Sequence, residues 1–204
     1  MHTLYPCILY LLKETIYHEM SHASHYTQVG TAWYTQFVNA ELAEIAAHPG
    51  ANDPLNPYGP GNDANAPIIA LGEAWAYHMG HFLADQRYGV NASCHIEQPG
   101  HTFCPNGTNH PHIDVLENFN PNLETDPFRW IPKGLMEDMM DNTPNETIVN
   151  DQVTGFTIGT LFNALQSDVS TVQQYRARIK SQNPVLPGGT TTTQLDNLFA
   201  SYLY

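Results

Sequence analysis

Basic residues are scarce in this chain. Of its 204 residues only 7 are Lys or Arg, against 20 Asp or Glu, and the formal net charge is −13. No basic cluster exists that can follow a phosphate backbone, so nucleic acid and anionic membrane surfaces are poor partners. Long apolar runs are also missing, because the longest, residues 4–12, is far below the roughly 20 residues that a membrane span requires. The sequence therefore predicts no transmembrane segment.

Alternation of apolar and polar residues, the pattern of a half-buried strand, is absent over any useful length. Apolar residues recur instead at helical spacing, and 42% hydrophobic residues are enough for a core. We therefore predict a mainly α class. The expected helices cover approximately residues 3–28, 31–47, 67–88, 134–140, 151–167, 170–181 and 192–201. In the second of them, the residues expected to form a buried stripe are Trp33, Phe37, Ala40, Leu42 and Ile45.

Cysteine is rare, with three in the chain and no C-x-x-C pair. Cys94 and Cys104 flank a loop that contains Pro and Gly, a setting in which a disulfide forms in an oxidising compartment. Free thiols, or a second metal site with the neighbouring His residues, are the alternatives. Cys7 is left over and is expected to be buried. The low content of charged residues, 13%, suits a secreted or periplasmic protein.

Residues 18–22, HEMSH, form a complete H-E-x-x-H motif. Apolar residues at helical spacing precede it, with no proline after Pro6, so we expect it on an α-helix. Four residues turn about 400° on a helix, which places His18 and His22 on one line, where both can bind one metal ion. Glu19, about 100° around the helix, can act on a water without binding the metal. The motif is typical of a zinc hydrolase, and a surface helix that carries His by chance is the alternative.

A catalytic zinc usually has three protein ligands and a water. His25 lies seven residues after His18 on the same face, but about 10 Å further along the axis, which is too far for the same ion. Glu73 is a better candidate, because it is a carboxylate within the otherwise apolar, helix-like stretch 66–83. A buried carboxylate needs a cation. We predict His18, His22 and Glu73 as the ligands, and a local cap or salt bridge at Glu73 is the alternative.

An H-E-x-x-H motif followed by a Glu on a later helix resembles the gluzincin branch of the zincin metallopeptidases. The segments 72–77, GEAWAY, and 155–165, GFTIGTLFNAL, also resemble zinc metallopeptidases of bacterial envelopes. The resemblance implies a Zn²⁺ cofactor, the motif Glu as general base, the later Glu as third ligand, and an extracellular or envelope location. The residues that carry it are His18, Glu19, His22 and Glu73.

The sequence departs from zincin patterns at several places. The metzincin motif H-E-x-x-H-x-x-G-x-x-H fails, since its Gly position is His25 and its last position is Gln28. Thermolysin-like gluzincins place an Asp four residues after the Glu ligand, where this chain has Tyr77. The β-sheet that usually precedes the motif helix is absent, because only 17 residues precede His18. We therefore interpret the chain as the catalytic part of a longer protein.

Four further side chains are candidates for work at the site. Tyr77 lies four residues after Glu73 on one helical face, so its phenol is predicted to donate a hydrogen bond to the oxyanion of a tetrahedral intermediate. His25, His78 and His81 are candidates for the same role or for binding a substrate carboxylate. Packed or solvated side chains are the alternative for all four, and we favour that alternative for His81.

The expected organisation is one mostly helical domain, residues 1–204, with metal-site helices over 1–88, a long cleft loop over 89–127 and C-terminal helices over 128–204. The predicted function is zinc-dependent hydrolysis of peptide bonds in a peptide or protein substrate. Glu19 is the predicted general base and a zinc-bound water the nucleophile. The alternatives are a zincin-like domain that binds zinc without catalysis, and a zinc hydrolase of a non-peptide amide or ester.

Overall fold

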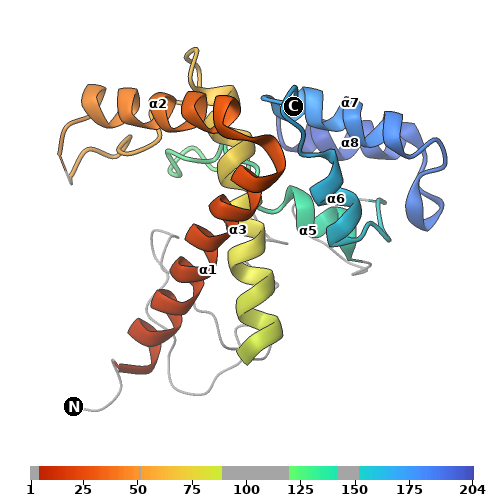
Figure 1. The fold of residues 1–204 in the computed structure, drawn as a ribbon, viewed down its shortest axis with the longest axis horizontal. Coiled ribbons are helices and arrows are strands. Elements are labelled where there is room, and N and C mark those ends of the chain that lie inside the picture. The colour runs from red at the N-terminus through yellow and green to blue at the C-terminus, as the bar shows by residue number, and fades with distance from the viewer. Residues whose placement is uncertain (1–4, 51, 89–119, 142–151) are drawn as a thin grey trace.

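The computed structural model describes residues 5–50, 52–88, 120–141 and 152–204, which form helices joined by turns (Figure 1). No strand occurs in these ranges, which confirms the mainly α class. None of the helices described there is long and apolar enough to cross a membrane. Cys94, Cys104 and most of the predicted cleft loop lie outside the described residues. The elements are α1 (Tyr5–Val29), α2 (Thr31–Ala47), α3 (Ala66–Tyr88), α5 (Leu135–Met140), α6 (Ile158–Ala164), α7 (Val172–Gln182), the 3₁₀ turn η1 (Pro187–Gly189) and α8 (Thr192–Ser201).

Helix α3 is the central element. It runs antiparallel to α1, its most extensive partner, and also contacts α2, α5 and α7 (Figure 1). Residues 69–81 of α3 are all buried, although this stretch contains a carboxylate and two imidazoles. A buried polar side chain must find a partner within the protein or a bound ligand. The buried polar side chains of α3 therefore indicate a candidate binding site on this helix.

The turn between α1 and α2 depends on a glycine. Gly30 has φ of +80° and ψ of 174°, a backbone conformation that side chains disfavour, and its N–H donates to the carbonyl of Tyr26. The chain therefore changes direction at this residue, and α2 lies across the end of the α1–α3 pair (Figure 1).

Helix α2 buries a narrower face than the sequence predicts. Trp33, Phe37 and Ala40 are buried, as expected. The prediction is wrong for Leu42 and Ile45, which are 56% and 42% exposed. The residue that continues the buried face after Ala40 is Glu44, four positions on, at 4% exposure. The polar environment of Glu44 explains why a carboxylate takes this place.

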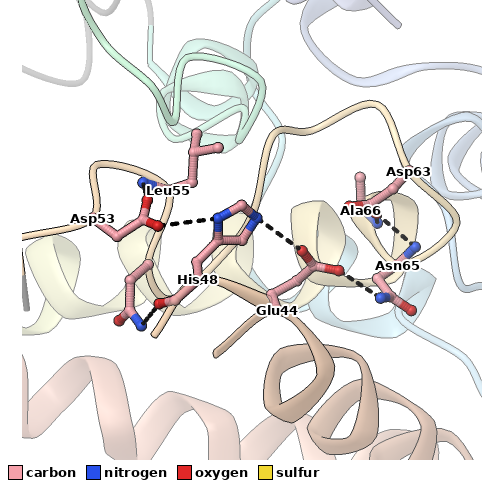
Figure 2. Close-up of polar contacts among 8 residues, drawn as sticks. Glu44, His48, Asp53, Leu55, Asp63, Asn65 and Ala66 are labelled. Carbon is pink, nitrogen blue, oxygen red and sulfur yellow. Dashed lines mark hydrogen bonds and ion pairs between the residues drawn. The ribbon is translucent and has the colours of Figure 1, made fainter. Parts of the chain in front are cut away.

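Figure 2 shows this environment, in which the loop after α2 folds back on Glu44. Asn65 donates to Glu44 Oε1 at 2.5 Å, and His48 Nε2 lies 3.9 Å from Glu44 Oε2 (Figure 2). The other ring nitrogen of His48 is 3.3 Å from Asp53. A Cβ atom at Gly59 would lie 2.1 Å from Glu44 Oε2, so the loop backbone rests directly on the carboxylate. These contacts close the 48–65 loop and lead the chain into α3.

The C-terminal helices pack against α3 and share one core with it (Figure 1). Trp33 Nε1 of α2 donates to the carbonyl of Val169 at 2.8 Å and so joins the N-terminal and C-terminal helices. Tyr202, after α8, donates to Asp138 of α5 at 2.8 Å. Both are buried, so they also satisfy polar groups within the core.

The predicted helix over 151–167 is too long. Helix α6 begins at Ile158, because Thr157 caps it by accepting from the backbone N–H of Thr160. Before the cap, Gly155 has φ of +82°, which interrupts any helix. The helices predicted over 31–47 and 192–201 are confirmed at both ends.

Candidate metal centre

The two motif imidazoles and Glu73 meet at the α1–α3 interface. His18 Nε2 lies 3.3 Å from Glu73 Oε2, and His22 Nε2 lies 3.2 Å from Glu73 Oε1. Helical spacing in α1 brings the two imidazoles together edge to face, with ring centroids 4.9 Å apart. The three side chains offer ligand atoms that all lie within 4.8 Å of one another, so they form a group that can hold a metal ion.

The spacing of these atoms fits a metal ion. Donors at about 2.0–2.1 Å from a tetrahedral ion lie roughly 3.3 Å apart. The two nitrogen–oxygen distances, to different oxygens of Glu73, are close to this value, and one donor atom from each residue lies within 4.8 Å of the others. Each oxygen of the single carboxylate faces a different imidazole nitrogen, and Glu73 is only 1% exposed. Two imidazoles and a carboxylate are a ligand set that binds divalent transition metals.

The protonation of Glu73 is set by competing effects. Burial by itself raises the pKa of its carboxyl group, but hydrogen bonds with His18 and His22 outweigh burial and hold the pKa well below the ordinary value. Glu73 is therefore ionised across the physiological pH range, as a metal ligand must be.

A second carboxyl group contacts this centre from α2. Burial, the charge of Glu73 and a hydrogen bond with Glu73 together raise the pKa of Glu41 to about 9. At neutral pH Glu41 therefore keeps its proton and can donate it to the Glu73 carboxylate. Tyr34, from the same helix, is half-buried, and burial together with the charges of Glu41, Glu73 and Glu19 raises the pKa of its phenol. α2 thus closes the centre on one side.

Glu19 and Tyr77 both lie near the ligand group. Glu19 is exposed, and its charge reaches Tyr34 and Glu41, so it lies beside the centre and open to solvent. Tyr77 is buried on α3, with its ring centroid 4.8 Å from that of His18. The Nζ atom of Lys133, itself buried, lies 4.6 Å from the Tyr77 ring centroid. The ring of Tyr77 therefore contacts both the ammonium group of Lys133 and the imidazole of His18.

The three other candidate histidines, His25, His78 and His81, are buried and do not belong to the ligand group. His25 packs on Trp33 with centroids 4.4 Å apart, and burial lowers its pKa to about 3. His78 lies 3.1 Å from Glu137 of α5, and His81 Nε2 lies 3.0 Å from Glu14 of α1. His78 and His81 thus each face a carboxylate, His25 packs against an indole ring, and the roles predicted for all three stay predictions.

Three residues of the site were missed from the sequence. Glu41 and Tyr34 belong to α2, whose two charged residues are both carboxylates. This excess of negative charge on one helix is the sequence feature that could have indicated a nearby cation site. Lys133 is one of only 7 basic residues, but nothing local in its sequence indicates that it lies near Tyr77.

Comparisons with protein-family models, curated proteins and solved structures find no match for this chain. The geometry of the described residues is therefore the basis for any assignment of function.

Proposed function

We propose that this protein is a zinc-dependent hydrolase of peptide bonds. The observation that carries the proposal is the arrangement of His18, His22 and the buried Glu73 carboxylate as three converging ligands, with the carboxylate of Glu19 beside them. Bound Zn²⁺ supplies Lewis acidity toward a carbonyl and lowers the pKa of a coordinated water.

The remaining roles, which are proton transfer, oxyanion stabilisation and ligand orientation, fall to protein side chains. Glu19 is exposed and does not belong to the ligand group, so it is free to accept a proton from the attacking water and return it to the leaving amine. Tyr77, next to His18, is the candidate donor to the oxyanion, and Lys133 behind its ring favours negative charge in front of it. Glu41 orients Glu73 through their hydrogen bond.

The presence of Glu19 also favours zinc over a redox metal. Two His and one carboxylate can also bind Fe²⁺ in oxygenases. A carboxylate base adjacent to the ligands serves hydrolysis and has no role in oxygen activation. Metal analysis of protein purified without chelators is expected to find close to one zinc per chain, and a predominance of iron would contradict this assignment.

The experiment is hydrolysis of a mixed peptide library by zinc-loaded protein in water enriched in ¹⁸O. Peptide hydrolysis puts one ¹⁸O atom into each new C-terminal carboxylate, which mass spectrometry detects. The zinc-depleted protein and His22→Ala are the controls, and both should be inactive. Absence of cleavage by the zinc-loaded protein would favour a binding domain, whereas cleavage of simple esters but not peptides would favour a non-peptide hydrolase.

A further inference from the structure

Two glycines of α3, Gly72 and Gly80, touch different helices. A Cβ atom at Gly72 would meet the Phe37 ring of α2 at 2.4 Å. At Gly80 it would lie 3.2 Å from His18 Cβ and 3.3 Å from the backbone oxygen of Glu14. The atoms around Gly80 are backbone and Cβ atoms of α1, which cannot rotate away. The missing side chain at position 80 therefore determines how closely α3 approaches the turn of α1 that bears His18.

A buried polar pair lies beside this close contact. His81 Nε2 is 3.0 Å from Glu14 Oε1, and the two residues are 3% and 7% exposed. A buried ion pair or hydrogen bond of this kind depends strongly on geometry, so it resists sliding of one helix along the other. Gly80 thus sets the distance between α1 and α3, and the Glu14–His81 pair sets their register.

We propose that Gly80 is a positioning residue for the metal centre, and that with the Glu14–His81 pair it holds the His18 and His22 imidazoles at ligand distance from Glu73. As far as metal is concerned, the inference rests on the proposed function. Metal sites tolerate donor displacements of only about 0.2 Å. A methyl group at position 80 requires its neighbours on α1 to move by a few tenths of an ångström, a displacement as large as the one that a metal site tolerates. Alanine is also a better helix former than glycine, so the substitution does not weaken α3 itself.

The test is a size series, Gly80→Ala and Gly80→Val, with Gly159→Ala as the matched control. Gly159 lies in another helix, α6, where the nearest atom to an added Cβ is Thr157 Oγ1 at 3.8 Å. Zinc affinity is measured by competition with a chromophoric chelator, and ligand geometry by the visible spectrum of the Co²⁺ form. We expect Gly80→Ala to raise the Kd for zinc about tenfold, as for other residues that orient ligands, and Gly80→Val to raise it further. Gly159→Ala should match the wild type in both measurements.

The polar pair is tested by two substitutions of one residue. His81→Gln keeps an N–H donor for Glu14 and should retain affinity close to that of the wild type, whereas His81→Leu loses the donor and should weaken zinc binding. Wild-type affinity and Co²⁺ spectrum in both Gly80→Ala and His81→Leu would overturn the inference. If Gly80→Val does not fold, the alanine variant decides.

A metal-free measurement separates this inference from the proposed function. In ¹⁵N NMR spectra of the apo protein, Gly80→Ala should shift the imidazole signals of His18 and His22, which face Glu73, and leave those of His48 unchanged. If the wild type binds no zinc, the proposed function fails, but these spectra still decide whether Gly80 positions the imidazoles. Unchanged His18 and His22 signals would count against it.

Discussion

The carboxyl group of Glu41 lies close enough to the carboxylate of Glu73 for Glu73 to raise its pKa, so a helix without a metal ligand reaches the ligand group directly. Glu41 is protonated at neutral pH, because burial and the charge of Glu73 raise its pKa to about 9. The pair therefore holds one proton and one negative charge, and the orientation of Glu73 depends on α2 as well as on α1.

This relationship predicts different outcomes for two substitutions of Glu41. Glu41→Gln keeps an N–H donor toward Glu73 and should change zinc affinity little. Glu41→Leu removes the donor and should weaken zinc binding by about 10- to 100-fold, the usual cost of losing a group that orients a ligand. Chelator competition measures both values. Equal loss in the two variants would show that hydrogen bonding is not the relevant property of Glu41.

The ligand group itself is tested by removing its members. His22→Ala and Glu73→Ala should each reduce bound zinc from about one per chain to a minor fraction, since each supplies one of three ligands. His48→Ala is the matched control, because His48 also lies between carboxylates but outside the group (Figure 2). Full zinc content in Glu73→Ala would rule out this residue as a ligand.

The burial of the His25 imidazole predicts a measurable pH dependence of the free energy of unfolding. Its pKa falls from about 6.5 when unfolded to about 3 in the native state, because burial disfavours the charged imidazole. Between these values the unfolded chain binds more protons, so the free energy of unfolding decreases as pH falls below 6.5, by up to about 1.4 kcal/mol per pH unit. His25→Phe should remove this slope while keeping an aromatic ring against Trp33. Urea unfolding of both metal-free proteins at several pH values measures the difference, and parallel curves would contradict the prediction.

The loop on Glu44 gives a prediction about stability alone. Gly59→Ala places a methyl group against the Glu44 carboxylate, at a residue with φ of +80°. Gly189→Ala is the control, since Gly189 has φ of +77° and no atom within 4 Å of an added Cβ. Both variants carry backbone strain, but only Gly59→Ala disturbs the Glu44–Asn65 hydrogen bond, so it should lose roughly 1–3 kcal/mol more. Equal losses in chemical denaturation would mean that the loop adapts to the methyl group.

Local sequence predicts most of the helices and the group of His18, His22 and Glu73 as possible ligands, because both depend on spacing. His18 and His22 are four residues apart on one helix, and Glu73 stands out as a carboxylate in an apolar stretch. The start of α6 was missed, since it depends on a cap at Thr157 and a left-handed residue just before it. Glu44 was missed for a different reason: its partners come from a later loop, so only tertiary contacts explain its burial.

Around the metal centre, too, local sequence does not reveal contacts that tertiary packing creates. Glu41 and Lys133 reach it through the packing of α2 and of the segment before α5 on α3, which no local pattern encodes. His25 shows the reverse case. Its place after the motif predicts a role in chemistry, but it is buried against Trp33 and does not belong to the ligand group.

The most direct test of the central claim compares the wild type with Glu19→Gln, with zinc quantified in each. Glutamine keeps the size and hydrogen-bonding reach of the side chain but cannot accept and return a proton. We expect equal zinc content, nearly equal thermal stability, and peptide hydrolysis reduced by roughly 10²–10⁴ in the variant, the usual contribution of general acid–base catalysis. Equal hydrolysis rates in two equally zinc-loaded proteins would contradict the assignment of Glu19 as the base.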